Sequence, residues 1–95
     1  MTTFGLIHGA NGSGAIWAGV VLELERRGHR VVAPDMPCED VDATFSDYAR
    51  TMRDALGGDE DAVIVGHSLG GCTAALLPAR RHVYLAAMIP QAGRT

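Results

Sequence analysis

The segment GHSLGG, residues 66–71, places glycines two residues before and two residues after a serine. It follows an apolar run and precedes a helical pattern. A serine on a sharp turn between strand and helix projects its hydroxyl above the sheet. Gly66 and Gly70 are small because side chains there would collide. The segment therefore predicts Ser68 as a nucleophile, with the backbone N–H of Leu69 facing the carbonyl that it attacks.

A nucleophilic serine of this kind needs a second N–H donor from the loop after a neighbouring strand. The segment LIHGANGSG, residues 6–14, has the right composition for such a loop. Ala10 would supply its backbone N–H, and Gly9 would allow close approach of the chain. His8 would hold the loop by hydrogen bonds. The two segments together predict an oxyanion hole beside the serine.

The same loop has a second interpretation as a phosphate cradle. Gly9, Gly12 and Gly14 lie between a strand and a helix, and Asp35 follows the next strand at a distance suited to a ribose contact. The spacing is GxxGxG, however, which matches neither the dinucleotide fingerprint nor a P-loop, and the chain contains no lysine. An NAD(P)-binding module and a non-catalytic binding protein both stay open as alternatives.

The sequence offers no general base for Ser68. The 27 residues after Ser68 contain neither Asp nor Glu. His67 is adjacent to the serine, but we expect its side chain to point away from the hydroxyl. His29 and His82 open strands, and Asp35 has the position of a loop acid. We therefore expect no catalytic histidine or orienting acid in this chain.

These segments require a scaffold, and the chain alternates strand and helix patterns throughout. Alternation of this kind predicts a parallel sheet with helices on both faces. If the first and third strands are neighbours, both loops open onto one crevice at the carboxyl ends of the strands. Apolar runs and helix-stop signals predict strands over 4–8, 30–33, 62–66 and 83–89, and helices over 13–27, 45–56 and 69–81.

Two of these helices carry a cap signal and an apolar face. Ser13 can cap the first helix, and Thr44 with Asp47 resembles a capping box before the second. The first helix places on one broad face Ile16, Trp17, Val20, Val21 and Leu24. The second brings together at helical spacing Phe45, Tyr48, Ala49, Met52 and Leu56.

Composition restricts the class of protein. The chain has 95 residues, 47% hydrophobic and 20% charged, which suits one small globular domain. A net charge of −3 gives no footprint for nucleic acid or an anionic membrane. The N-terminus lacks a signal peptide's basic start and apolar core. We expect a cytoplasmic protein with a small-molecule partner, and no metal.

Four segments carry a resemblance to a known family: LIHGANGSGAIW, GHRVVAPDMP, VIVGHSLGG and VYLAAMIP. In this order and spacing they resemble the α/β-hydrolase fold family. They are most similar to the plant esterase and hydroxynitrile lyase branch and to its bacterial carboxylesterase relatives. The resemblance implies Ser68 as nucleophile and Leu69 and Ala10 as oxyanion-hole donors. It implies acyl transfer on a small carboxylic ester or related carbonyl compound, with no cofactor.

The family's triad runs in the order serine, acid, histidine along the chain. The resemblance covers the serine and four strands of a larger sheet. We therefore expect residues 1–95 to be the N-terminal part of a single α/β-hydrolase domain. The last strand, long and apolar, would form an exposed edge, so we also expect self-association through it.

Overall fold

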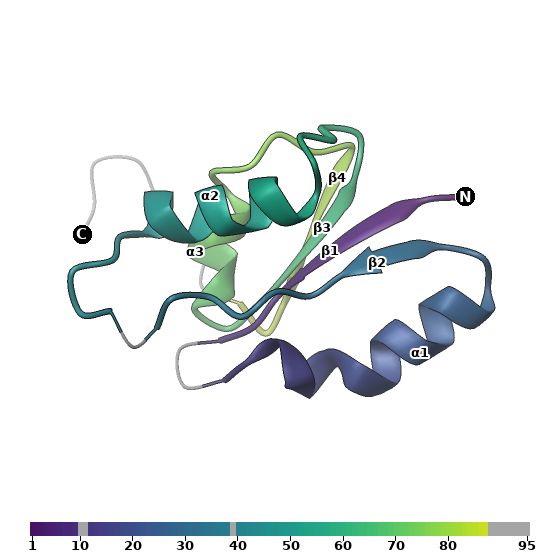
Figure 1. Ribbon diagram of the computed structural model, residues 1–95, viewed down its shortest axis with the longest axis horizontal. Helices are drawn as coiled ribbons and strands as arrows, with labels where there is room; N and C mark the ends of the chain where they lie inside the picture. Colours follow the sequence, from purple (N-terminus) through teal and green to yellow (C-terminus); the bar gives the residue numbers. More distant parts are fainter. Residues whose placement is uncertain (10–11, 39, 88–95) are drawn as a thin grey trace.

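The computed structural model describes residues 1–9, 12–38 and 40–87. Its centre is one sheet of parallel strands in the order β2-β1-β3-β4 (Figure 1). The first and third strands are neighbours, which meets the condition for both loops to open onto one crevice, and Ile7 at the end of β1 lies opposite Gly66. The loops after these two strands therefore leave the sheet side by side. The strands are β1 (Thr3–Ile7), β2 (Arg30–Val32), β3 (Val63–His67) and β4 (Arg81–Leu85).

Helices cover both faces of this sheet, which confirms the predicted α/β class. Figure 1 shows α1 on one side and α2 with α3 on the other. Within the described ranges, no helix is both long and apolar enough to cross a membrane. The helical elements are the 3-10 helix η1 (Gly14–Trp17), α1 (Ala18–Arg26), α2 (Phe45–Ala55) and α3 (Gly70–Ala74).

The core lies between the sheet and the face covered by α2 and α3. Met52 of α2 and Ile64 of β3 are completely buried. A Cβ on Gly5 of β1 would stand 2.9 Å from atoms of both side chains, so α2 sits directly on the strand. Burial of such side chains stabilises the fold by about 1.5–3 kcal/mol each. The remaining buried members of this cluster include Ile7, Met36, Ala49, Leu56, Ala62, Ala74 and Leu77.

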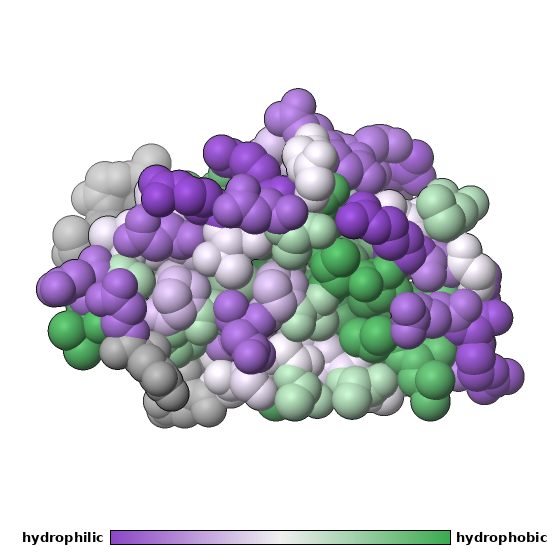
Figure 2. All heavy atoms as spheres, in the orientation of Figure 1, coloured by the Kyte–Doolittle hydropathy of each residue, from purple (hydrophilic) through white to green (hydrophobic). Residues whose placement is uncertain are grey.

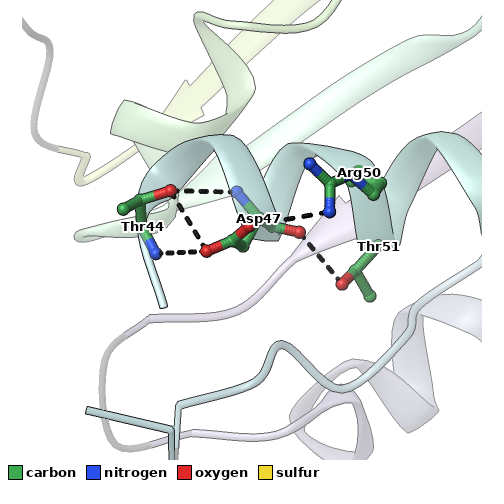
Figure 3. Close-up of polar contacts among 4 residues, drawn as sticks. All are labelled: Thr44, Asp47, Arg50 and Thr51. Atoms are coloured by element: carbon green, nitrogen blue, oxygen red, sulfur yellow. Dashed lines mark hydrogen bonds and ion pairs between the residues drawn. The ribbon is translucent and has the colours of Figure 1, made fainter. Parts of the chain in front are cut away.

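A capping box fixes the start of α2 (Figure 3). The Thr44 hydroxyl accepts the Asp47 N–H at 3.2 Å, and the Asp47 carboxylate accepts the Thr44 N–H at 2.8 Å. This backbone hydrogen bond is the main reason why the pKa of Asp47 is lowered from 3.8; Arg50 contributes a smaller lowering. The structure thus confirms Thr44 and Asp47 as a capping box. The cap also fixes the position of Tyr48, the residue that follows Asp47.

Two predicted elements differ from the structure by more than one residue at an end. The helix predicted over 69–81 ends at Ala74, because Pro78 cannot continue a helix and disfavours helical geometry at Leu77. The strand predicted over 83–89 instead spans Arg81–Leu85 as β4. It ends where Ala86 takes a positive φ of 45°. Positions 88 and 89 of the predicted strand lie outside the described residues.

The predicted apolar face of the first helix is only partly buried. Ser13 caps η1 as expected, and Trp17 is buried. Ile16 and Val20, which share that helical face, are however 53% and 43% exposed, so only part of the face is buried. Figure 2 shows apolar side chains gathered between β2 and α1. Val31 of β2 and residues of α1 line a groove of about 530 Å³ there.

Candidate active site

Ser68 follows β3 in a strained backbone conformation. Its φ is 54°, in the left-handed region, which costs an L-residue roughly 1–2 kcal/mol. Only Ser68 and Ala86 share this property among the described non-glycine residues. The Ser68 N–H donates to the Leu85 carbonyl at 3.3 Å, and the Ser68 carbonyl accepts the Gly71 N–H at 3.1 Å. Strain held in place by backbone bonds on both sides is characteristic of functional turns.

The glycines around Ser68 permit this turn because neighbouring backbone is too close for a side chain. A Cβ on Gly66 would lie 2.8 Å from the Gly70 carbonyl oxygen. A Cβ on Gly70 would lie 2.8 Å from the carbonyl oxygens of Ile7 and His8. These separations are shorter than real Cβ contacts. The turn therefore closes on itself and against the end of β1, which is the steric reason predicted for both glycines.

The loop after β1 touches the serine. A Cβ on Gly9 would stand 3.2 Å from the Ser68 Cβ and 3.5 Å from the His67 carbonyl oxygen. The Gly12 N–H donates to the Gly9 carbonyl at 3.1 Å. Ala10, the predicted second oxyanion donor, lies outside the described residues. The structure thus brings the two predicted loops together at Ser68.

Leu69, the predicted first oxyanion donor, is the N-cap of α3. Its carbonyl accepts the Cys72 N–H at 3.1 Å. Within the described residues, its own N–H has no backbone acceptor. Helix N-termini carry N–H groups without intrahelical partners, and these groups are suited to an anion. The Leu69 N–H is therefore available at the turn that carries Ser68.

His8 is buried at the end of β1, with only 3% of its surface exposed, and both ring nitrogens are engaged. The Met36 N–H donates to Nε2 at 2.9 Å, so Nδ1 carries the proton and donates to the Gly9 carbonyl at 2.6 Å. One side chain therefore ties the loop after β1 to the loop after β2. With both nitrogens occupied, His8 has no free lone pair to act as a base on Ser68.

His67 points into the interior beside Trp17. The two rings meet edge to face, with centroids 6.3 Å apart. The His67 Nδ1 and the Trp17 Nε1 are both buried and have no hydrogen-bond partner among the described residues. No hydrogen bond joins His67 to Ser68 in this part of the chain, in line with the orientation expected from the sequence.

The two remaining histidines are also hydrogen-bonded to groups other than Ser68. His29 accepts the Thr2 N–H at 3.1 Å through Nδ1. The Nε2 of His82 lies 2.8 Å from the Leu77 carbonyl oxygen. Within the described residues, therefore, no histidine hydrogen-bonds to Ser68, and a general base for it is not found there.

Asp35, the candidate ribose ligand, has a partner within the loops. Its Oδ1 accepts the Gly14 N–H at 2.7 Å, which joins the loop after β2 to the start of η1. A Cβ on Gly14 would collide with the Ala33 carbonyl, so this glycine is needed for the close approach. The carboxylate thus holds two loops together. This role agrees with the interpretation of Asp35 as a loop acid rather than as a contact to a cofactor.

Tyr48 of α2 is a residue at this site that the sequence did not single out for function. With His8, Gly9, Leu69 and Gly70 it lines a small cavity of about 10 Å³. Helical spacing predicted that Tyr48 faces inward, and its ring is half-buried as expected. Periodicity identifies the inward face of a helix but not the segment that it meets, so the contact with both loops could not be predicted.

Comparison with known proteins identifies the class to which this fold and turn belong. A family model described as the alpha/beta hydrolase family matches residues 6–95. The chain belongs to this family, as the sequence resemblance implied. The order of the strands and the serine turn between β3 and α3 agree with that assignment.

Individual relatives include plant and bacterial esterases. The probable esterase PIR7A of Oryza sativa subsp. indica is 35% identical over 96% of this chain and 41% of its own length. The pyrethroid hydrolase of Sphingobium wenxiniae is 37% identical over 95% of this chain and 37% of its own. The crystal structure of polyneuridine aldehyde esterase superposes with a TM-score of 0.85 at 29% identity, covering 100% of this chain and 44% of that one. The chain thus spans about two fifths of each relative.

Proposed function

We propose that this chain carries the nucleophile and the oxyanion hole of a serine hydrolase that acts on small carboxylic esters. The observation that supports this most strongly is the backbone of Ser68, held at a φ of 54°. Gly9 is packed against the Ser68 side chain. A strained serine between a strand and a helix N-terminus is the arrangement from which hydrolases of this family attack a carbonyl.

In the proposed reaction, the Ser68 Oγ bonds to the ester carbonyl carbon while its proton passes to a general base. The carbonyl oxygen becomes an oxyanion, which the N–H groups of Leu69 and Ala10 stabilise. The alkoxide leaves with a proton, and an acyl-serine remains. Water then attacks the acyl-serine, releases the acid and restores the hydroxyl.

We propose that the general base for Ser68 and the acid that orients it are not among residues 1–95. Within the described residues, His8, His29 and His82 are hydrogen-bonded elsewhere, and the half-buried His67 packs edge to face against Trp17. The chain corresponds to about two fifths of the relatives' length. We therefore propose that residues 1–95 form the nucleophile-bearing part of one hydrolase domain.

The substrate class follows from two sources. An oxyanion hole built from backbone N–H groups recognises any ester or thioester carbonyl. The relatives are named as a methylesterase, esterases and a pyrethroid hydrolase, which all point to esters. A small carboxylic ester is the simplest substrate consistent with both, and the proposal requires no cofactor.

A fluorophosphonate probe tests this function in the protein as its organism makes it. We expect labelling at Ser68 and complete loss of labelling in Ser68→Ala. Ser46→Ala is the matched control, because Ser46 is an exposed serine of α2 away from the turn. Equal labelling of wild type and Ser68→Ala would contradict the proposal. Absence of labelling together with binding of an apolar carbonyl ligand would favour a non-catalytic binding protein.

A further inference from the structure

Tyr48 occupies an unusual place between the two loops that form the site. It lines the cavity of about 10 Å³ together with His8 and Gly9 from the loop after β1 and Leu69 and Gly70 from the serine turn. A space of that size holds at most one water molecule. Tyr48 therefore lies beside both loops with little free volume between them.

The start of the helix and two side-chain contacts fix the ring itself. The capping box at Thr44 and Asp47 sets the first turn of α2, immediately before Tyr48 (Figure 3). The Tyr48 side chain packs against the buried core cluster. Phe45, one turn earlier, meets the ring edge to face with centroids 6.1 Å apart. The ring is therefore held by the helix and the core, independently of the two loops.

The hydroxyl end of Tyr48 reaches the loop after β2. A hydrogen bond with the Cys38 thiol is the main reason why the pKa of Tyr48 is raised, and burial adds to it. The Cys38 N–H donates to the Met36 carbonyl at 2.7 Å. The Met36 N–H in turn binds the His8 ring. Tyr48 thus contacts the segment that also holds His8 in place.

From these contacts we propose that Tyr48 is a positioning residue of the oxyanion hole. Its ring supports, from the side of α2, the turn that carries the Leu69 N–H and the loop that follows β1. The inference rests on the proposed function, because it concerns the same oxyanion hole. Removing the ring leaves a void beside both loops, and a loop that relaxes into that void carries its N–H away from the oxyanion. Misplacement by about 1 Å can reduce the rate by roughly 10²-fold.

The test uses the protein as its organism makes it, with p-nitrophenyl acetate as the ester. Active sites are first counted by fluorophosphonate titration, so that kcat refers to correctly folded enzyme only. We expect Tyr48→Leu to lower kcat by about 10- to 100-fold while KM changes by less than about threefold, because the loss falls on the transition state. Tyr48→Phe, which keeps the ring, is expected within about threefold of wild type.

Phe4→Leu is the control for loss of an aromatic ring. Phe4 lies near the start of β1, contacts the His29 ring and does not line the cavity, so kcat per titrated site is expected to stay at the wild-type value. A second readout is the affinity for a trifluoromethyl ketone, which forms an oxyanion on the serine. In Tyr48→Leu this affinity should fall by the same factor as kcat/KM.

A wild-type kcat and ketone affinity per titrated site in Tyr48→Leu would overturn the inference. If that variant is insoluble, Tyr48→Met replaces it, with the same loss expected because it also lacks the ring. If Ser68 is labelled in the wild type and the Tyr48 variants keep wild-type kinetics, the role of Tyr48 is contradicted. The proposed function is not contradicted by that result. A wild type without labelling or turnover overturns the proposed function and this inference together.

Discussion

Gly70 is the position where one added methyl group should push the serine turn away from the end of β1. A Cβ there would lie 2.8 Å from the carbonyl oxygens of Ile7 and His8, whereas ordinary contact begins at 3.4 Å. The serine turn must therefore move 0.6 Å from the end of β1 in Gly70→Ala. Both opposing atoms belong to backbone, so no flexible side chain can move aside instead.

The energetic cost combines two opposing terms. Overpacking of this kind costs about 1–3 kcal/mol. Alanine gains up to about 1 kcal/mol over glycine in a helix, and Gly70 is the first residue of α3. The clash outweighs the gain, so we expect Gly70→Ala to lose about 1–2 kcal/mol of unfolding free energy. Gly19→Ala in α1 is the control, since nothing lies within 4 Å of its Cβ and only the gain applies.

Urea unfolding followed by tryptophan fluorescence measures both variants, because the emission of buried Trp17 changes on unfolding. The displacement also separates the Gly9 loop from Ser68, so fluorophosphonate labelling of Gly70→Ala should slow by about 10-fold or more. Labelling of Gly19→Ala should be unchanged. Wild-type stability and labelling in Gly70→Ala would refute the close packing of the turn on β1.

Three further predictions follow from the same contacts. Ser68→Gly should be more stable than Ser68→Ala by about 1 kcal/mol in urea unfolding, because glycine adopts a positive φ without strain. Neither variant should react with the probe, and equal stabilities would contradict a strained serine. His8→Phe should lose about 1–3 kcal/mol, because the buried Met36 N–H and Gly9 carbonyl lose their partner; a neutral effect on urea unfolding would rule out that bridge. The lowered pKa of Asp47 means that its ionised form stabilises the fold above pH 3.8 and that this stabilisation is lost as the pH falls through the lowered value. Asp47→Asn should therefore be less stable than wild type at neutral pH, with a difference in unfolding free energy that shrinks below pH 3.8; a difference independent of pH would count against the cap.

Local signals in the sequence were sufficient for the serine turn. Gly66 and Gly70 flank Ser68 after an apolar strand, and that combination has few physical explanations. The capping box of Thr44 and Asp47 was equally local and was confirmed. Rules on parallel sheets predicted the α/β class, but whether β1 and β3 are neighbours stayed a condition until the structure showed that they pair.

Predictions failed where a local pattern was extended past its stop signal or where the outcome depended on distant segments. Pro78 ends the region of α3 early, although the apolar spacing continues beyond it. Ile16 and Val20 match a buried helical face but remain exposed, because periodicity does not show what packs on a face. Helical spacing grouped Tyr48 with other residues of its helix, and only the fold shows that it lines a cavity with both loops.

A crystal structure of the natural protein with a phosphonate covalently bound would test the central claim most directly. The account predicts a bond from phosphorus to the Ser68 Oγ. It also predicts a phosphonyl oxygen about 2.7–3.1 Å from the backbone nitrogens of Leu69 and Ala10. A phosphonate on another residue, or an oxygen directed away from the Leu69 N–H, would contradict it.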